Sequence, residues 1–312
     1  MKMWVSGAAS GFGAAISAKA RSAGWTVVGV DVEPAAGVQF VDVRDASAVR
    51  ASIEAADADV VFANAGFGAF GPIDAFDEEL MDDLWRTNVL GVWNVARWSL
   101  AGLRAKRGVW AVSSSVAGRM VFPESGPYAA TKHAVEALAE ALYLENASFG
   151  VRVRVLEPGA HRTGFGPTAT RRSPPRLPTD AVAPLRPVWD ERKSEVLVAD
   201  GAAEGVADAL MRSLGDPVGF LRLPVGVDAE NLIGARDALG PTLAVRAMAD
   251  RLGVGTGALL TPDEVLRDGA ERDARWAATA SAASWGQLEH WARGPDGVAA
   301  LARLRASPPT RC

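Results

Sequence analysis

The chain has 312 residues, a length that allows one large domain or two small ones. Hydrophobic residues make up 49%, charged residues 22% and the formal net charge is −4, so composition excludes an intrinsically disordered chain and gives no sign of nucleic-acid binding. One cysteine, Cys312, and three histidines exclude a disulfide framework and a metal cluster of His and Cys ligands, so we expect a cytoplasmic protein without a bound metal. The apolar runs are too short to span a membrane, and no hydrophobic leader precedes the first glycine-rich turn.

Short β-branched runs alternate with longer alanine-rich helical patterns along the first 240 residues. Strands are predicted at about 4–5, 25–30, 60–63, 109–112, 151–156 and 219–223, and helices at about 11–23, 45–56, 78–106, 126–149 and 202–214. Continuously apolar strands separated by helices are typical of a parallel sheet that is covered on both faces. The pattern therefore predicts a doubly wound α/β fold of Rossmann type.

The alternation breaks at residues 162–200 and stops after residue 240. Residues 162–200 are rich in proline and arginine, and so long a stretch without predicted structure indicates a lid over a functional site. Its basic residues are Arg171, Arg172, Arg176, Arg186 and Arg192. Interspersed acidic residues favour a solvated face over a site for an anionic substrate. We expect residues 1–240 to form the catalytic domain and residues 241–312 to be a helical extension packed on that same domain.

A glycine-rich turn joins the first strand to the first helix, in Ser6-Gly7-Ala8-Ala9-Ser10-Gly11-Phe12-Gly13. Glycines let the backbone approach a pyrophosphate, and the helix N-terminus offers free N–H groups and the positive end of its dipole. The spacing G-x-x-x-G-x-G differs from the more usual G-x-G-x-x-G, and a plain tight turn is the alternative. The strand–turn–helix context favours a nucleotide site.

Asp31 ends the second strand. A carboxylate there can accept hydrogen bonds from an adenosine ribose and repels a 2′-phosphate. An aspartate that merely ends a strand is the alternative. Because the glycine-rich turn is in place and contains no basic residue, the sequence favours NAD over NADP.

Tyr128 and Lys132 lie one helical turn apart in Tyr128-Ala129-Ala130-Thr131-Lys132. The chain has two tyrosines and five lysines, so a chance Y-x-x-x-K is expected roughly 0.03 times. A phenol that acts as a base near neutrality needs its pKa lowered by roughly 3 units, about 4 kcal/mol. An ammonium about 4 Å away supplies this at an effective dielectric constant of 20. A surface pair is the alternative, which the position after the fourth strand disfavours.

The fourth strand ends in Ser113-Ser114-Ser115, where a hydroxyl can hold a substrate oxygen. A serine hydrolase is disfavoured because the chain has no G-x-S-x-G motif.

Together these residues resemble the short-chain dehydrogenase/reductase family, from about Met3 to Thr163 and more loosely to about Asp228. The first turn is similar to the family's T-G-x-x-x-G-x-G, Asn64-Ala65-Gly66 to its N-A-G element, and Pro158-Gly159 with Thr163 to its P-G-x-x-x-T turn. Asp42-Val43 resembles the pair that meets the adenine ring. The resemblance implies that NAD is bound by Gly7, Ser10, Gly11, Phe12, Gly13, Asp31, Asp42, Val43, Asn64, Ala65, Gly66, Tyr128, Lys132, Pro158, Gly159, His161 and Thr163.

The resemblance also implies the catalytic set. Ser115 lies thirteen residues before Tyr128 and begins S-x-x-G, so it matches the catalytic serine better than Ser113 or Ser114 does. Asn88 matches the helix asparagine of a proton relay and would hold a water that connects Lys132 to solvent. The implied reaction is hydride transfer between a secondary alcohol and a ketone. Tyr128 acts as acid and base, Ser115 fixes the substrate oxygen, and Lys132 lowers the tyrosine pKa and bonds the nicotinamide ribose.

His161 departs from the family pattern, which often has Val or Ile at this position. Its backbone N–H is expected to meet the nicotinamide carboxamide. Its side chain is interpreted as an ordinary one on this turn, and a ring that faces the substrate is the alternative.

The substrate and the assembly are predicted less directly. Phe70, Phe122 and Phe165 lie near motif ends and suggest an apolar pocket, hence a hydrophobic or aromatic secondary alcohol or ketone. Two other classes of function are a cofactor-binding sensor or scaffold without turnover, and an epimerase or dehydratase relative. The complete catalytic set disfavours the first, and the P-G turn disfavours the second.

The predicted helix at 78–106 carries Trp85, Trp93 and Trp98 among aliphatic residues. Such a stripe commonly lies in a core. In the family that the chain resembles, however, this helix often packs against its copy, so a homodimer or homotetramer is expected.

Overall fold

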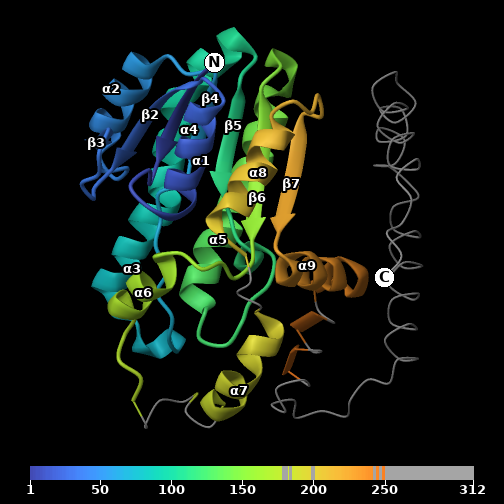
Figure 1. Cartoon of the computed structure of the whole chain (residues 1–312). Helices are drawn as coiled ribbons and strands as arrows, with labels where there is room; N and C mark the ends of the chain where they lie inside the picture. The colour runs from blue at the N-terminus through green and yellow to red at the C-terminus, as the bar shows by residue number, and fades with distance from the viewer. Residues whose placement is uncertain (178–181, 183–184, 198–200, 242–243, 246–247, 250–312) are drawn as a thin grey trace. The chain divides into compact units, whose positions relative to one another are not determined.

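The computed structural model describes residues 1–177, 182, 185–197, 201–241, 244–245 and 248–249, and at residues 192 and 195 the backbone alone. The strands are β1 (Lys2–Ser6), β2 (Thr26–Asp31), β3 (Val38–Phe40), β4 (Val60–Ala63), β5 (Val109–Ser113), β6 (Arg152–Pro158) and β7 (Phe220–Val225). The α-helices are α1 (Gly11–Ser22), α2 (Ala46–Ala56), α3 (Glu78–Trp85), α4 (Gly91–Lys106), α5 (Gly126–Asn146), α6 (Phe165–Arg172), α7 (Arg186–Val196), α8 (Ala203–Ser213) and α9 (Val227–Leu239). Figure 1 shows them coloured in chain order.

The seven strands form one parallel sheet in the order β3-β2-β1-β4-β5-β6-β7. The strand order reverses at β1, which pairs with β2 on one side and with β4 on the other, so that Val5 lies between Gly29 and Phe62. In such a sheet, ligands bind beyond the carboxyl ends of the strands at the point of reversal. The predicted doubly wound, Rossmann-type fold is confirmed.

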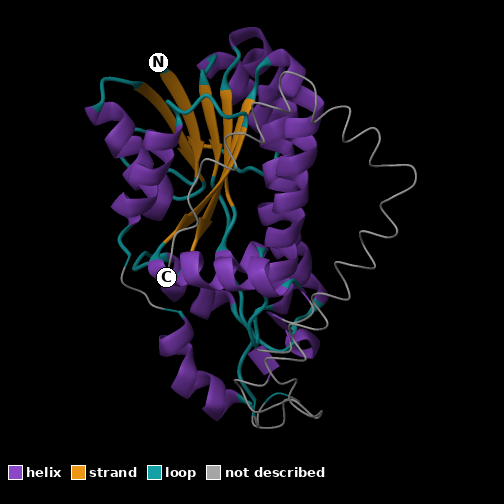
Figure 2. Cartoon of the chain, turned by 90° about the vertical axis from the view of Figure 1, so that its right-hand side faces the viewer, coloured by secondary structure: helices purple, strands orange, loops and turns teal. Residues whose placement is uncertain are grey.

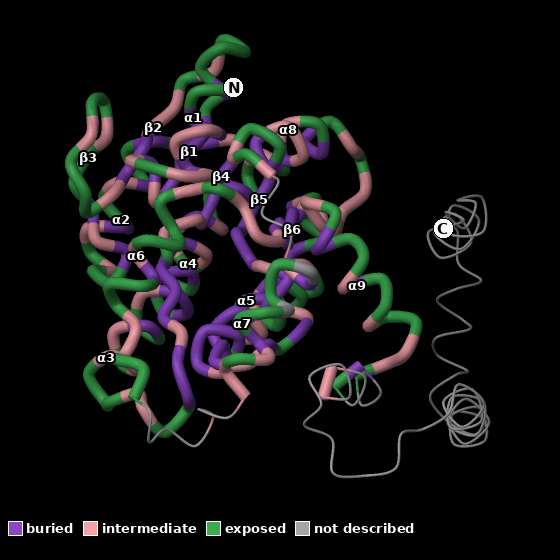
Figure 3. Tube along the Cα trace, turned by 60° about the horizontal axis from the view of Figure 1, so that its bottom comes forward, coloured by how far each residue is buried: buried purple, intermediate pink, exposed green. Residues whose placement is uncertain are grey.

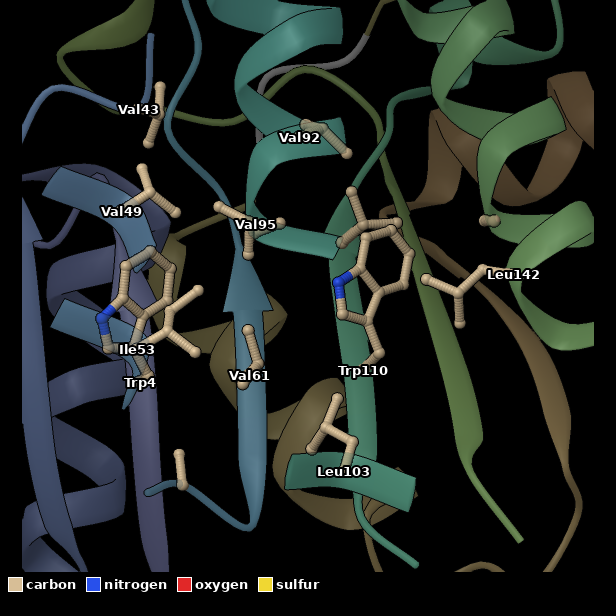
Figure 4. Close-up of a cluster of buried hydrophobic side chains, with 14 of the residues drawn as sticks. Trp4, Val43, Val49, Ile53, Val61, Val92, Val95, Leu103, Trp110 and Leu142 are labelled. Atoms are coloured by element: carbon tan, nitrogen blue, oxygen red, sulfur yellow. The ribbon is translucent and has the colours of Figure 1, made fainter. Parts of the chain in front are cut away.

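Helices cover the sheet on both faces (Figure 2). Because successive side chains of each strand point to opposite faces, each strand contributes to the core on both sides. On β1, Trp4 enters a core layer with side chains of α2, α4 and α5, and Trp110 of β5 joins the same layer (Figure 4). Met3 and Val5 enter the opposite layer, with side chains of α1 and α8. Full burial of each large side chain stabilises the fold by about 2 kcal/mol. Burial is continuous along the central strands β4 and β5 (Figure 3).

The six predicted strands and four of the five predicted helices are confirmed. The predicted helix at 78–106 is instead three pieces, since a π-helical turn at Arg86–Leu90 separates α3 from α4. Strand β3 was not predicted, because it is a three-residue strand at the sheet edge in which Phe40 is exposed. Helix α9 was not predicted either.

The predicted lid is not structureless, since α6 and α7 lie within residues 162–200. The interpretation of its arginines as a solvated face holds for Arg172 and Arg176, which are exposed although they form ion pairs, and was wrong for Arg186, whose side chain is 12% exposed. Arg172 pairs with Asp83 at 3.2 Å, whereas Arg176 and Arg186 both pair with the buried carboxylate of Glu124, at 2.5 and 2.7 Å. The first of these ion pairs ties the segment to α3, and the other two tie it to the loop that precedes α5.

Arg171 donates to Thr168, while the side chain of Arg192 lies outside the described residues. The predicted helical extension at 241–312 falls almost wholly outside them too and stays a prediction. In the described part of the chain, no helix combines the length and apolarity that a membrane crossing needs. Searched over the same residues, His, Cys, Asp and Glu form no group that could hold a metal ion.

Candidate active site

Asn64 ties together the carboxyl ends of β1, β4 and β5. Its side-chain amide donates to the carbonyl oxygens of Ser6 at 3.1 Å and Gly7 at 3.2 Å. Its Oδ1 accepts from the Ser113 hydroxyl at 2.8 Å, and the Ser6 hydroxyl accepts from the Asn64 and Ala65 amides, each at 3.0 Å. These bonds join the glycine-rich turn to the strand that leads to the serine cluster.

The glycines of the first turn have different roles. Gly7 has a φ of +67°, and a Cβ on it would lie 2.7 Å from the Asn64 amide nitrogen. A Cβ on Gly13 would overlap the carbonyl oxygen of Gly7. Gly11 has a φ of +52° and faces the side chain of Thr163, with room for ordinary contact. Gly7 and Gly13 thus let the turn pack tightly against neighbouring protein atoms. Gly11 instead faces Thr163, in the turn that the sequence predicts to lie beneath the nicotinamide.

The N-terminus of α1 is suited to a phosphate group. Ser10 stands at the N-cap but makes no capping hydrogen bond through its side chain, so it leaves the first helical amides without that partner. An uncapped helix start after a glycine-rich turn is an anion-binding arrangement.

Asp31 ends β2 and contacts the glycine-rich turn. Its carboxylate accepts hydrogen bonds from the Ala9 amide at 2.9 Å and the Glu33 amide at 3.1 Å. Asp31 is thereby held beside the turn, where its charge would meet the ribose end of a dinucleotide.

Asp42 and Val43 follow β3. Asp42 is bound by the guanidinium of Arg44, and this hydrogen bond is the main reason that the pKa of Asp42 is lowered. The Val43 side chain is buried against Gly91, and the Val43 carbonyl accepts from Asn94 at 2.9 Å. Contact of this pair with an adenine ring stays a prediction.

Tyr128 and Lys132 lie on the buried face of α5, and each is 6% exposed. The Lys132 ammonium donates to the carbonyl oxygen of Ser113 at 2.8 Å and lies 5.8 Å from the centroid of the Tyr128 ring. The two residues are therefore brought together at the carboxyl end of β5, as predicted.

The expected effect of Lys132 on Tyr128 is not seen in the protein alone. Burial raises the pKa of Tyr128 above its ordinary value, and hydrogen bonding with the Ser115 side chain offsets only part of this. Burial also lowers the pKa of Lys132 to about 8, although the Glu136 carboxylate opposes this shift. Lys132 does not lower the pKa of Tyr128 here because its ammonium donates to the Ser113 carbonyl and because burial removes solvent from both groups.

The three serines after β5 separate by role. The Ser115 hydroxyl accepts from the Ala117 amide at 3.1 Å, is 3.4 Å from the Pro158 carbonyl oxygen, and is the hydrogen-bonding neighbour of Tyr128. Ser113 links Asn64 to Lys132. The Ser114 hydroxyl is buried and makes no hydrogen bond. Only Ser115 is next to the phenol, which agrees with its predicted role.

Asn88 lies in the π-helical turn, a form that often marks functional sites. Its amide donates to the Phe67 carbonyl at 2.8 Å and to Thr131 at 3.1 Å, and its Oδ1 accepts from the Phe67 amide at 3.0 Å. A Cβ on Gly66 would lie 2.9 Å from this Oδ1. The Asn88 side chain thus joins α5 to the segment after β4 through both of its amide hydrogens and its oxygen, and a water held by that side chain stays a prediction.

The turn after β6 is fastened by Asp228, which sequence reasoning missed. Its carboxylate accepts from the Ala160 amide at 2.7 Å, and any Cβ on Gly159 would overlap it. The His161 ring packs edge-on to Phe12 at 5.4 Å between centroids, and its Nδ1 lies 3.1 Å from the Gly159 carbonyl oxygen. The ring thus joins the two turns that the sequence predicts to hold the cofactor.

An aromatic cluster covers the phenol. Tyr128 lies 5.5 Å from the Phe70 ring and 5.6 Å from the Phe165 ring at the start of α6, between centroids. Phe122 does not join this cluster, since it stacks on Trp189 of α7 at 6.1 Å. In Figure 1, α6 and α7 lie beyond the arrowheads of the strands, at the end where α5 begins.

Two buried acidic residues near this site were also missed, Glu136 on α5 and Glu157 on β6. The available signal was the position of Glu136, four residues after Lys132 and so on the same helix face. No comparable signal marked Glu157, because its neighbours are distant in sequence.

Comparison with known proteins agrees with this geometry. Residues 2–173 match the model of the short chain dehydrogenase family. A 3-ketodihydrosphingosine reductase of Bacteroides thetaiotaomicron is 34% identical over 172 residues, 52% of this chain and 64% of that protein. Estradiol 17-beta-dehydrogenase 1 of Rattus norvegicus is 36% identical over 129 residues, 40% of this chain and 38% of that protein. An uncharacterized oxidoreductase of Schizosaccharomyces pombe is 34% identical over 41% of this chain and 57% of its own length.

The chain thus spans less than two thirds of the length of these curated relatives. A short-chain dehydrogenase structure from Streptomyces avermitilis is 28% identical, with a TM-score of 0.67 over 82% of this chain and 99% of that one. An alcohol dehydrogenase from Thermococcus sibiricus, complexed with 5-hydroxy-NADP, is 25% identical, with a TM-score of 0.58 over 73% of this chain and 97% of that one. From the family match over more than half of its length, the chain belongs to the short-chain dehydrogenase/reductase family.

Proposed function

We propose that this oxidoreductase interconverts a hydrophobic or aromatic secondary alcohol and its ketone, with NAD as the hydride carrier. The observation that carries the proposal is the cluster of a hydroxyl, a phenol and an ammonium at Ser115, Tyr128 and Lys132, at the carboxyl end of a parallel sheet. The names of two relatives, a 3-ketodihydrosphingosine reductase and an estradiol 17-beta-dehydrogenase, are in line with this reaction type.

Two features of the structure suit a dinucleotide, and two more favour NAD over NADP. The uncapped start of α1 can take a pyrophosphate, and the turn bearing Gly11 faces Thr163 across to the turn after β6. The carboxylate of Asp31 beside the first turn disfavours a 2′-phosphate. Arg44, the basic residue after Asp42, already has its guanidinium bound by Asp42 and Asp83. NAD is therefore the preferred cofactor in this proposal.

The side chains of the site transfer the proton of the substrate hydroxyl and stabilise the substrate oxygen. When bound, the nicotinamide would supply the hydride acceptor or donor. In oxidation the Tyr128 oxygen takes the proton of the substrate hydroxyl, while the Ser115 hydroxyl donates to the same substrate oxygen and fixes its position. Burial raises the pKa of Tyr128 in the protein alone, so in this proposal the charge of Lys132, which is protonated below pH about 8, would favour the anionic form of the phenol once the cofactor is bound. Reduction follows the same path in reverse.

The aromatic cluster supports a substrate that is apolar next to its reacting carbon. Phe70 and Phe165 flank the phenol and offer ring faces and edges rather than charges. Arg172 of α6 is paired with Asp83, and Arg176 in the segment after it is paired with Glu124, which leaves both poorly suited to an anionic substrate.

The test is turnover with aromatic and aliphatic secondary alcohols, with NAD and NADP in parallel, followed by nicotinamide absorbance. Tyr128→Phe should abolish turnover and leave NADH binding, read by fluorescence, nearly unchanged. Tyr143→Phe is the matched control, because the other tyrosine of the chain packs on Phe220 and should keep full activity. Wild-type turnover in Tyr128→Phe would remove the mechanism.

Two further classes of function have defined outcomes in the same assays. NADH binding without turnover of any substrate would favour a sensor or scaffold. Loss of substrate without net change in nicotinamide absorbance would favour an epimerase or dehydratase.

A homodimer or homotetramer in the cytoplasm completes the proposal. Trp98 packs on the core, whereas Trp85 and Trp93 are 38% and 43% exposed on the α3–α4 side. Exposed tryptophans suit an interface between copies. Sedimentation as a monomer would refute the assembly.

A further inference from the structure

A buried acidic pair lies behind Lys132, and the mechanism above does not use it. Glu136 follows Lys132 by one turn of α5, and Glu157 is the penultimate residue of β6. Their side chains are 8% and 0% exposed. Buried carboxylates are rare unless they are paired, so this pair calls for a physical reason.

Two arginines hold one oxygen of each carboxylate. Arg222 Nε donates to Glu136 Oε2 at 3.0 Å and lies 3.5 Å from Glu157 Oε1, while Arg119 bonds Glu157 Oε1 at 3.0 Å. The arginines also pair outward, Arg222 with Glu140 and Arg119 with Asp237. The second oxygen of each buried carboxylate, Glu136 Oε1 and Glu157 Oε2, is buried and makes no hydrogen bond.

Gly118 connects the pair to the catalytic serine turn. A Cβ on Gly118 would overlap the Ser114 hydroxyl and would lie 3.3 Å from the unbonded Glu136 Oε1. The glycine of the S-x-x-G turn therefore allows Ser114 and Glu136 to approach it. The Glu136 carboxylate thus lies against the turn that begins with Ser115, on the same helix face as Lys132.

The surroundings of the pair favour the neutral form of one carboxyl. Burial and the neighbouring Glu136 raise the pKa of Glu157 to about 7, despite Arg119 and Arg222. As the pH falls, Glu157 therefore takes up a proton more readily than an ordinary glutamate does. Arg222 on β7 contacts Glu136 directly and also pairs with Glu140 on α5 and with Glu157 on β6. Lys132 lies one turn before Glu136 on the same face of α5, and Arg119 and Asp237 are one contact further away.

We propose that Glu136 is a positioning residue for the proposed hydride-transfer site, because its buried carboxylate, oriented by Arg222, keeps the ammonium of Lys132 charged. The inference rests on the proposed function for its purpose, but not for its test. Without an adjacent negative charge, burial would favour a neutral amine, which neither attracts a phenolate nor donates strongly to a ribose. Glu136 acts through Lys132 and does not contact the reacting atoms.

The charge on Lys132 can be read from the lysine itself. The chain has five lysines, so a protein labelled with ¹³C at lysine Cε gives few signals, and the Lys132 signal is the one missing in Lys132→Met. Its chemical shift is followed against pH in the wild type and in Glu136→Gln. We expect the pKa of Lys132 to fall by about one unit in Glu136→Gln, a tenfold rise in its acid dissociation constant.

Two variants serve as controls. Glu140→Gln removes a carboxylate from the next turn of α5, which also pairs with Arg222 but is 56% exposed, and should leave the Lys132 titration unchanged. Glu136→Asp keeps the charge and should restore most of the wild-type pKa. If Glu136→Gln does not fold, Glu136→Met, which has a side chain of similar length, carries the same expectation.

An unchanged Lys132 titration in folded Glu136→Gln or Glu136→Met would overturn the proposal. This result is independent of turnover, because the titration needs neither cofactor nor substrate. If the enzyme is active, the pH at which kcat/KM is lost on the alkaline side should also fall by about one unit in Glu136→Gln. A merely structural role would lower kcat/KM equally at every pH.

Discussion

Lys132→Met should change the pH dependence of folding stability in a way that the buried ammonium predicts. Lys132 is 6% exposed, and burial lowers its pKa from the ordinary 10.5 to about 8. A difference of about 2.5 units corresponds to about 3 kcal/mol of stability that the folded protein loses by keeping this group charged. Substitution by methionine removes that cost. Loss of the hydrogen bond to the Ser113 carbonyl destabilises the variant by about 1 kcal/mol, which offsets part of the gain.

The sign follows from proton binding. Between about pH 8 and about pH 10.5 the unfolded chain keeps the Lys132 proton while the folded chain releases it, so this group makes stability rise with pH. From near pH 7 to near pH 9 the rise amounts to about 1.3 kcal/mol. At lower pH both states are protonated and the full cost of the buried charge is present.

Urea denaturation of both proteins near pH 7 and near pH 9 measures the effect. The wild type should gain about 1.3 kcal/mol more than Lys132→Met over this interval, and near pH 7 the variant should be the more stable protein. Lys19→Met, at a lysine whose side chain is 47% exposed, controls for the loss of a charge. Equal changes with pH in the wild type and Lys132→Met would refute the reasoning, because a lysine that titrates alike in both states contributes no slope.

Two other substitutions test the cofactor and substrate ends of the site. Asp31→Ala should reduce the preference for NAD over NADP in kcat/KM by at least about tenfold, since it removes the carboxylate that repels a 2′-phosphate. Glu33→Ala is the control. An unchanged preference in Asp31→Ala would show that Asp31 does not contact the ribose. Phe165→Ala should raise KM for an aromatic alcohol about fivefold, because an aromatic contact is worth about 1 kcal/mol, and should leave a small aliphatic alcohol unaffected. A KM that rises equally for both alcohols would contradict a ring contact with the substrate, and Phe149→Ala, at an exposed ring on Arg104, is the matched control.

Local patterns were sufficient for most of the fold. Buried parallel strands are continuously apolar, so β4 and β5 could be located to within one residue from Val60 and Val109 onward. Elements with weaker patterns were missed or misplaced. The edge strand β3 is short and exposed, and the π-helical turn at Arg86–Leu90 has no hydrophobic period of its own.

Short motifs predicted the residues around the phenol for the same reason. Tyr128 and Lys132 are neighbours through the helical repeat alone, so their approach needs no knowledge of the rest of the chain. The identity of Ser115 came from a resemblance, and the tertiary contacts then separated it from Ser113 and Ser114.

The sequence by itself determined the element order, the parallel sheet and the tyrosine–lysine pair, because each depends on residues close together along the chain. Only the tertiary structure decided the environment of that pair. Arg222 of β7 reaches Glu136 and also pairs with Glu157 of β6, and Asp228 reaches Gly159 from 69 residues away. Burial and distant charges set a pKa, and neither is encoded in local spacing. For this reason the sequence alone led to a lowered pKa for Tyr128, whereas the folded chain raises it.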